Sequence, residues 1–242
     1  MVDYARSERK IFCTCMGASM KKVLVDVGAH TGETLSVAMQ EKWGFDQIYS
    51  FEPASPCWPS LDRMADDRVK ILRFGLWSQD AQMILHDPGS IGASVHQSKA
   101  ARPNSLLAEF KDAAKWFDDN IDPSDEVVVK LNCEGAECEI LDRLLEAGHL
   151  ENVSELLIHF DVRKVPGQEF REAETRHALD RAGVRYRSAE TIFFGRNTQE
   201  KTANWLAWYN AKGVRKLRYS LVRRVEFAIR RPAYRLRKWS GL

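Results

Sequence analysis

Short apolar segments that alternate with helix-like segments constrain the fold of this chain more than any other feature. Val23–Val27 reads VLVDV and Glu126–Leu131 reads EVVVKL, and both are nearly continuous apolar runs of strand length. Such runs are typical of strands in a parallel sheet, because helices cover both faces of these sheets. Further strands or strand extensions are predicted at Ile48–Phe51, Val69–Phe74, Met83–Leu85, Leu156–Phe160, Val184–Arg187 and Thr191–Gly195, the last two as a hairpin.

The segments between these strands carry apolar residues at helical spacing. We predict helices over Glu33–Lys42, Leu106–Phe117, Ala136–Ala147 and Phe170–Ala182. Gly148 and Gly183 follow the last two helices at the position where glycine commonly ends a helix. Strands that alternate with helices predict an α/β fold, a Rossmann-like doubly wound and mostly parallel sheet.

The charge is distributed unevenly along the 242 residues. The whole chain has 36 Lys and Arg against 34 Asp and Glu, but residues 212–242 hold 11 basic residues and one acid, a net charge of +10. The other 211 residues hold 25 basic residues and 33 acids, a net charge of −8. We therefore divide the chain into a Rossmann-like domain over 1–211, with an N-terminal lead-in at 1–20, and a basic amphipathic tail over 212–242.

The composition predicts a cytoplasmic protein. Hydrophobic residues make up 44% and charged residues 29% of the chain, as in ordinary globular proteins and unlike collagens or disordered tails. No run approaches the ~20 apolar residues of a spanning helix, and the first twenty residues lack a signal-peptide core. The five cysteines are odd in number and unpaired in spacing, so neither a disulfide framework nor a zinc site is expected.

A glycine-containing loop follows the first predicted strand, at the carboxyl edge where α/β sheets bind ligands. It reads Asp26-Val27-Gly28-Ala29-His30-Thr31-Gly32. Gly28 and Gly32 have no side chain, so their backbone can approach a ligand closely. His30 stands where a GxGxxG loop has its middle glycine. Because histidine is among the residues that tolerate left-handed backbone, we expect the turn to persist.

Acidic residues around this loop favour a cationic ligand. A dinucleotide would place its pyrophosphate at the N-terminus of the following helix, but Asp26 and Glu33 would repel it and attract an ammonium or a sulfonium. Glu52 ends the second strand, 24 residues after Gly28, where an acid can bind ribose hydroxyls. We therefore predict S-adenosylmethionine as the ligand. NAD is the alternative ligand. Each of the acids, taken alone, could also be a solvated residue or one that interacts with the helix dipole.

Three sequence blocks together resemble FkbM-type S-adenosylmethionine-dependent methyltransferases. The blocks are Val25–Gly32, Phe51–Pro53 and Val129–Glu137, and the similarity covers Val23–Asp80 and Val127–Asp161. The resemblance implies a Rossmann-like fold of the class I methyltransferase type with seven strands. It also implies O-methylation, typically of sugar hydroxyls or polyketide alcohols.

The chain departs from the family pattern at three positions. His30 replaces the usual asparagine, Asn132 replaces the usual aspartate, and His159-Phe160-Asp161 stands where a glutamate is expected. Residues Ala81–Asp125 match poorly, as expected of an insertion that shapes an acceptor pocket. From the loop and the resemblance we assign cofactor contacts to Asp26, Gly28, Ala29, His30, Thr31, Gly32, Glu33, Thr34, Glu52, Pro53, Asn132 and Glu134.

Methyl transfer to a hydroxyl requires alignment of the acceptor oxygen and removal of its proton. His159 and Asp161 lie two apart on a predicted strand and share a face near its carboxyl end. We predict His159 as the base and Asp161 as the residue that orients it or the acceptor; a histidine bonded to a carbonyl is the alternative. Asn132 can hold a hydroxyl or the cofactor's ammonium, or cap the next helix. Rival bases are His30, His86 and His96.

Metal and thiol chemistry are less favoured at this site. Asn132, Glu134, His159 and Asp161 offer ligands that Mg²⁺ accepts, but we favour a metal-free site and leave metal dependence open. Cys133 and Cys138 are expected to be small core residues rather than nucleophiles.

The basic tail predicts a docking function. Val214, Leu217, Leu221 and Val225 follow the spacing of one helical face, with cations largely off it and Trp239 near the end. Such a helix suits an anionic membrane surface, where lipid-linked glycans are built. The alternative is that the stripe packs on the acidic body or across a homodimer. Nucleic-acid binding is not expected, because no recognition module accompanies the charge.

Overall fold

The computed structural model describes residues 20–101, 103–188 and 195–211. Its centre is a six-stranded sheet in the order β3-β2-β1-β7-β8-β9, in which every pairing is parallel. This confirms the predicted Rossmann-like sheet. The strands are β1 (Lys22–Val27), β2 (Gln47–Phe51), β3 (Val69–Leu72), β7 (Glu126–Leu131), β8 (Val153–Ile158) and β9 (Tyr186–Ser188).

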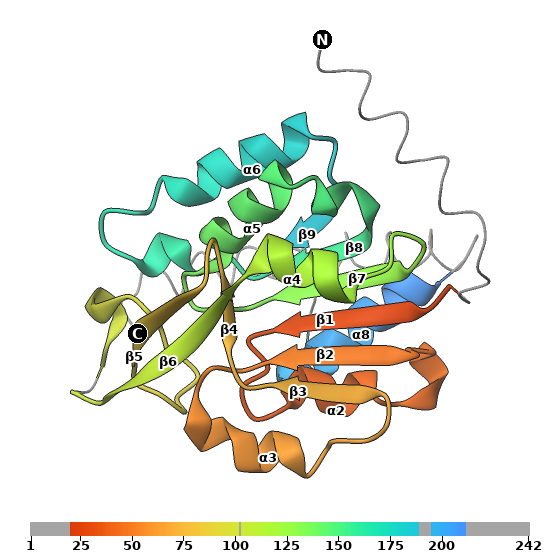
Figure 1. The fold of residues 1–242 in the computed structure, drawn as a ribbon, viewed down its shortest axis with the longest axis horizontal. Coiled ribbons are helices and arrows are strands. Elements are labelled where there is room, and N and C mark those ends of the chain that lie inside the picture. Colours follow the sequence, from red (N-terminus) through yellow and green to blue (C-terminus); the bar gives the residue numbers. More distant parts are fainter. Residues whose placement is uncertain (1–19, 102, 189–194, 212–242) are drawn as a thin grey trace.

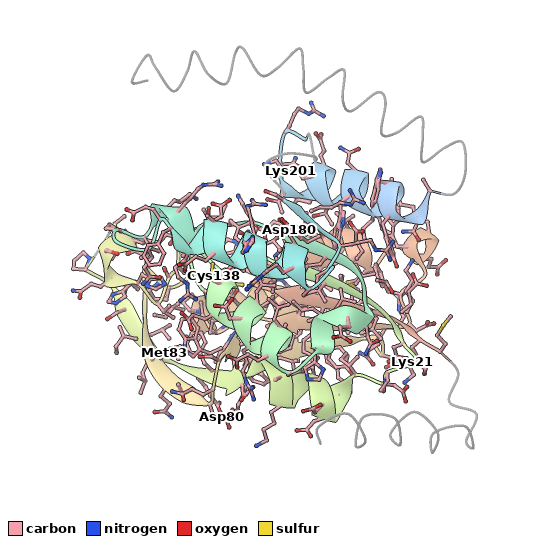
Figure 2. All side chains as sticks on the ribbon, turned by 90° about the horizontal axis from the view of Figure 1, so that it is seen from above. Lys21, Asp80, Met83, Cys138, Asp180 and Lys201 are labelled. Carbon is pink, nitrogen blue, oxygen red and sulfur yellow. The ribbon has the colours of Figure 1, made fainter. Side chains whose placement is uncertain are left out.

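Helices cover both faces of this sheet (Figure 1). One face buries the apolar sides of α4 (Ala113–Asn120), α5 (Glu137–Glu146) and α6 (Arg171–Arg181). The other face buries α2 (Glu33–Ala38), α3 (Trp58–Asp62) and α8 (Thr198–Asn210). Figure 2 labels Lys201 on α8 and Cys138 on α5, which belong to these two opposite layers.

Short 3-10 turns complete the connections. They are η1 (Glu41–Trp43), η2 (Ser55–Cys57), η3 (Gln97–Lys99), η4 (His149–Asn152) and η5 (Val162–Lys164). The strand order reverses between β1 and β7, because β2 and β3 lie on one side of β1 and β7, β8 and β9 on the other. In open α/β sheets ligands bind at this switch point, outside the carboxyl ends of the strands.

A second, three-stranded sheet stands beyond the carboxyl ends of β1 and β2 (Figure 1). Its order is β4-β6-β5, with β4 (Gly75–Trp77) parallel and β5 (Ala81–His86) antiparallel to β6 (Ser105–Asp112). The predicted edge strand Met83–Leu85 is therefore part of this separate sheet. The insertion expected over Ala81–Asp125 supplies two of its three strands.

The helix predicted over Leu106–Phe117 is wrong over its first half. Ala108 and Phe110 are buried while Leu107 and Glu109 are exposed, which is the alternation of a strand. The helix begins only at Ala113, where the Asp112 carboxylate accepts the N–H groups of the first turn. The segment carries both patterns, because Leu107 and Phe110 fit helical spacing while Ala108 and Phe110 fit a strand, so spacing alone could not separate the two.

The chain after β8 also differs from expectation. β9 pairs in parallel with β8. The predicted hairpin is not tested, because most of its second strand, Thr191–Gly195, lies outside the described residues. Helix α8 was not predicted from the sequence; its Trp205 and Leu206 are fully buried against the α2 side of the sheet. The basic tail 212–242 and nearly all of the 1–20 lead-in lie outside the described residues. Among the described residues, no helix has the length and apolarity to cross a membrane.

Candidate functional site

A cavity opens at the switch point, between the carboxyl ends of β1, β2 and β7 and the second sheet. Leu85, Ile91, Val95 and Phe110 of the inserted segment form its apolar wall. Nine of the twelve predicted cofactor residues line it, namely Gly28, Ala29, His30, Glu33, Thr34, Glu52, Pro53, Asn132 and Glu134. Asp26, Thr31 and Gly32 do not.

The glycines of the first loop serve packing within the protein. Gly28 has φ +80°, and a β-carbon added there would lie 2.0 Å from the Asn132 carbonyl oxygen. Gly32 has φ +95°, and its β-carbon would lie 2.7 Å from Met64 Sδ. Packing against the Asn132 backbone therefore requires glycine at position 28; Gly28 also lines the cavity, and the predicted close approach to a ligand stays a prediction. His30 does adopt the left-handed backbone, with φ 49°.

Glu52 is held in place by backbone donors. Its Oε2 accepts the His30 N–H at 2.7 Å and its Oε1 accepts the Ala54 N–H at 2.8 Å. The residue is 6% exposed, and burial raises the pKa of its carboxyl, a shift that these hydrogen bonds oppose. The first loop and the end of β2 are therefore one hydrogen-bonded unit on the cavity wall.

Glu33 occupies the first turn of α2 and is oriented by the loop. Its Oε1 accepts a hydrogen bond from Thr31 Oγ1 at 2.6 Å and lies 3.0 Å from His30 Nδ1. Partial burial disfavours the charged form, but these hydrogen bonds outweigh it and lower the pKa of Glu33. A carboxylate at this position disfavours a diphosphate, as the sequence predicts. Thr31 does not line the cavity but contacts two residues that do, Glu33 and His30.

Asp26 has a different role from the one predicted. It is fully buried, and Lys130 Nζ lies 2.9 Å from its Oδ1 while donating to the Gly28 carbonyl at 2.7 Å. Burial raises the pKa of Asp26, and the Lys130 ammonium opposes that shift. Because its charge is already paired behind the cavity wall, Asp26 supports the loop and does not attract a ligand directly.

Asn132 places an unsatisfied acceptor at the cavity. Its backbone N–H donates to the Val27 carbonyl at 3.1 Å, which continues the β1–β7 ladder into the loop. Its Oδ1 is buried and has no hydrogen-bond partner among the described residues. A buried acceptor without a donor costs free energy unless a ligand or water supplies one. Asn132 lines the cavity, so a donor from a ligand at this wall would satisfy that oxygen.

The inserted segment is pinned onto the turn after β7. Lys99 Nζ donates to both the carbonyl and Oε2 of Glu134 at 2.7 Å, and Ser94 Oγ donates to the same carbonyl at 2.7 Å. His96 Nε2 lies 3.3 Å from the Gly135 carbonyl, and burial lowers the pKa of this histidine. Glu134 itself has φ 52°. The insertion therefore fixes a strained turn at the cavity edge.

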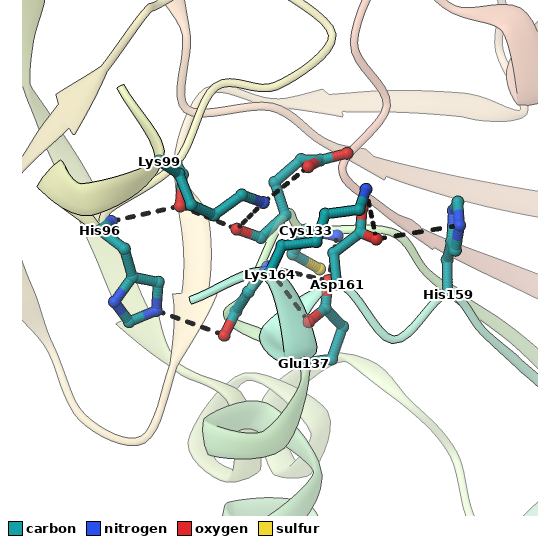
Figure 3. A network of polar contacts seen from close by, with 10 residues as sticks. His96, Lys99, Cys133, Glu137, His159, Asp161 and Lys164 are labelled. Atoms are coloured by element: carbon teal, nitrogen blue, oxygen red, sulfur yellow. Dashed lines mark hydrogen bonds and ion pairs between the residues drawn. The ribbon is translucent and has the colours of Figure 1, made fainter. Parts of the chain in front are cut away.

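The predicted catalytic pair forms, but away from the cavity wall. His159 Nε2 lies 4.0 Å from Asp161 Oδ1, and Lys164 Nζ lies 2.6 Å from the same oxygen (Figure 3). The His159 side chain is 35% exposed, whereas that of Asp161 is buried at 1%. Neither residue lines the cavity. His159 therefore does not face an acceptor in this cavity, and the prediction that it is the direct base is not supported.

Glu134, which does line the cavity, and Asp161 are close enough for each carboxyl to shift the pKa of the other. Burial and the Asp161 charge raise the pKa of Glu134. Burial also disfavours a charged Asp161, but Glu134 and Lys164 outweigh it and lower the Asp161 pKa.

Metal and thiol chemistry find little support in the described part of the chain. No group of three or more His, Cys, Asp or Glu side chains there is arranged to hold a metal ion. Lysine ammonium groups already pair with Glu134 and Asp161. Burial raises the thiol pKa of Cys57 to about 12 and that of Cys138 to about 11, and it also raises that of Cys133. These thiols are therefore poor nucleophiles.

Comparison with solved structures finds a crystal structure of the methyltransferase FkbM from Methylobacillus flagellatus KT. The match has 18% sequence identity and a TM-score of 0.42, and it covers 66% of this chain and 37% of that chain. The neighbour carries the name of the family that the sequence motifs resemble. No family model and no curated protein matches the sequence.

Proposed function

We propose that the cavity binds S-adenosylmethionine and that the chain is an O-methyltransferase acting on a carbohydrate hydroxyl. The observation that carries the proposal is the acidic lining of the cavity at the switch point. Glu33, Glu52 and Glu134 line it, and of these Glu134 is paired with Lys99; the positive charge of Lys130, which also lines it, is paired with Asp26. A wall of this kind attracts an ammonium and a sulfonium and repels the diphosphate of NAD.

The residues present fit this cofactor. Glu52 ends β2 with both carboxylate oxygens held by backbone donors, so its remaining lone pairs can accept hydrogen bonds from the two ribose hydroxyls. Asn132 Oδ1 is a buried acceptor that the ammonium of the methionine part can satisfy. When bound, S-adenosylmethionine supplies an electrophilic methyl group whose bond to sulfur breaks, with its electron pair going to sulfur, as the acceptor oxygen bonds to the carbon.

The inserted segment is the proposed acceptor wall. Lys99, Ser94 and His96 hold it against the turn after β7, so the acceptor side of the cavity is preorganised. The proposal of a carbohydrate acceptor rests on the family resemblance. The apolar residues Leu85, Ile91 and Val95 on this wall favour a second candidate, the alcohol of a lipid or polyketide, or a glycan carried on a lipid.

Calorimetry of the full chain with S-adenosylhomocysteine and, separately, with NAD⁺ tests the cofactor. We expect binding of the first and no heat with the second; tight NAD⁺ binding alone would reject the proposal. Glu52→Gln is expected to weaken S-adenosylhomocysteine binding by about 10-fold or more, because a charged acceptor is lost. Glu151→Gln, at an exposed position, is the matched control and leaves the affinity unchanged.

Turnover separates an enzyme from a binding module. Methyl transfer from labelled S-adenosylmethionine to a panel of glycans, lipid-linked glycans and lipid alcohols identifies the acceptor class. A chain that binds the cofactor and transfers no label to any of them would be a non-catalytic nucleotide-binding module.

A further inference from the structure

We propose that His30 recognises the α-carboxylate of S-adenosylmethionine and so makes the cavity selective for a cofactor that carries this group. The inference rests on the proposed function and deepens it by naming a specificity-determining residue. S-adenosylmethionine carries a sulfonium, an ammonium and a carboxylate, and the acidic lining of the cavity accounts for the two cationic groups only. The carboxylate needs a partner of its own.

An acidic cavity disfavours a carboxylate unless a donor faces it. The side chains of Glu33 and Glu52 line the wall that the proposed cofactor would contact. A ligand carboxylate beside them would lose its water and meet charges of its own sign, and both effects cost free energy. A cationic or strongly donating side chain on the same wall removes this cost.

His30 is the lining residue that can supply the positive charge. Among the described residues that line the cavity, only His30 and Lys130 have side chains that can be cationic. The Lys130 ammonium already lies 2.9 Å from Asp26 Oδ1 and donates to the Gly28 carbonyl at 2.7 Å. The imidazole ring of His30 is therefore the partner left for a ligand carboxylate.

The imidazole ring of His30 has an acceptor at each nitrogen. Nδ1 lies 3.0 Å from Glu33 Oε1, and Nε2 lies 3.4 Å from the Gly89 carbonyl oxygen of the inserted segment. Thr31 Oγ1 lies 3.3 Å from Nδ1, but it donates its proton to Glu33 Oε1 at 2.6 Å. Because a nitrogen that faces an acceptor donates only when it carries a proton, the imidazolium fits this position best.

Nε2 is the end of the ring that a ligand can use. Its contact with the Gly89 carbonyl is long for a hydrogen bond, whereas Nδ1 is held by Glu33. The His30 side chain is 26% exposed and lines the cavity. A carboxylate accepts from a charged donor more strongly than a peptide carbonyl does, so it can replace or share the contact with Gly89.

The place of His30 in the first loop also suits the covalent structure of the ligand. The ammonium and the carboxylate of S-adenosylmethionine are attached to the same carbon atom, so their partners must lie close together. The proposed partner of the ammonium is Asn132 Oδ1, and the Asn132 backbone packs against Gly28, two residues before His30. This contact brings the two proposed partners to neighbouring positions on the wall.

A comparison of two ligands in two proteins tests the assignment. The ligands are S-adenosylhomocysteine and its decarboxylated analogue, in which a hydrogen atom replaces the carboxylate. We expect calorimetry to show that the wild-type full chain binds S-adenosylhomocysteine about 10-fold or more tightly than the analogue. His30→Gly removes the ring and keeps the left-handed backbone, since His30 has φ 49°. This variant should lose affinity for S-adenosylhomocysteine and keep that for the analogue.

Two further variants are controls for this comparison. Glu52→Gln removes the proposed contact with the ribose, which both ligands carry, so it should weaken both by the same factor and preserve their ratio. His149→Gln replaces a histidine that does not line the cavity and should leave both affinities unchanged.

The ratio of the two affinities decides the outcome. Equal binding of the two ligands by the wild type would overturn the assignment, and so would a loss of both ligands by the same factor in His30→Gly. The failure of the proposed function looks different, because the wild type would then not bind S-adenosylhomocysteine at all. Binding of S-adenosylhomocysteine with an unchanged ratio in His30→Gly rejects the role of His30 and leaves the cofactor proposal standing.

Discussion

Lys130 and Asp26 face each other across the β1–β7 pairing in direct register, with Lys130 Nζ 2.9 Å from Asp26 Oδ1. Both side chains are at least nine-tenths buried. The Lys130 ammonium also donates to the Gly28 carbonyl, so one buried ion pair holds the start of the first loop. The pair therefore shapes the cavity wall without contributing charge to it.

Removing one partner of this ion pair should destabilise the fold strongly. Lys130→Met leaves the Asp26 carboxylate buried without a counter-charge, and we expect a loss of about 3–5 kcal/mol in the free energy of unfolding. The double variant Asp26→Leu/Lys130→Met removes both charges and should be the more stable of the two. Urea denaturation measures both. A double variant as unstable as Lys130→Met would contradict the assigned pairing.

The same double variant examines the revised role of Asp26. Because Asp26 does not line the cavity, S-adenosylhomocysteine binding should survive its replacement when Lys130 is replaced as well. Loss of binding in a folded double variant would restore Asp26 as a direct ligand contact.

Gly28 should tolerate no side chain. Gly28→Ala places a β-carbon 2.0 Å from the Asn132 carbonyl and adopts φ +80°. Gly148 has a similar φ of +77° with no atom near its missing β-carbon, so Gly148→Ala isolates the backbone cost. We expect about 1–2 kcal/mol for Gly148→Ala, and about 1–3 kcal/mol more for Gly28→Ala from the overlap. Thermal denaturation compares the stabilities of the two variants. Equal losses of stability would show that the contact between Gly28 and the Asn132 carbonyl relaxes freely.

Glu137 should make stability fall as the pH rises. Its carboxyl is buried at the start of α5, where it accepts the N–H groups of Cys133 and Gly135 at 3.1 Å, and burial raises its pKa from 4.5 to about 7. The folded state therefore binds more protons than the unfolded state between these values. This group's contribution to stability is full below pH 4.5 and falls by about 3 kcal/mol as the pH rises to 7.

Glu137→Gln removes that pH dependence. Urea denaturation at pH 4.5 and pH 8 gives the free energy of unfolding, and the decrease between them should be about 3 kcal/mol smaller in the variant than in the wild type. Glu146→Gln, at an exposed position of the same helix, should change nothing. An identical decrease in Glu137→Gln and wild type would show that Glu137 is charged throughout.

The central sheet could be predicted from the sequence because its signal is local. A strand such as Glu126–Leu131 is buried on both faces and therefore reads as a continuous apolar run, and its predicted and observed bounds agree. The segment Ser105–Asp112 carries no such signal. Its apolar residues fit a helical face as well as an alternating strand, and only pairing with β5 and β4 decides between them.

The cavity-lining residues could be predicted in part, because glycine loops and strand-end acids have fixed places in an α/β sheet. The ion-pair and hydrogen-bond partners of those residues could not be predicted. Lys130 stood in the sequence as one cation in an apolar strand, and its register with Asp26 appears only once β1 and β7 pair. Lys99 lies 35 residues before Glu134, and no sequence spacing indicates their contact. The position of His159 away from the cavity likewise depends on where β8 ends.

The basic tail, outside the described residues, remains a docking proposal that liposomes can test. Residues 212–242 carry a net charge of +10, and each cation near an anionic surface contributes about 1 kcal/mol. We expect the full chain to sediment with vesicles rich in phosphatidylserine at low salt, and to dissociate as salt screens the attraction. A chain ending at residue 211 and neutral vesicles are the controls. Equal sedimentation with and without the tail would reject membrane docking and leave two roles for the tail, packing on the acidic body or across a homodimer. Sedimentation velocity of the full chain and of the chain ending at residue 211 then distinguishes these two roles.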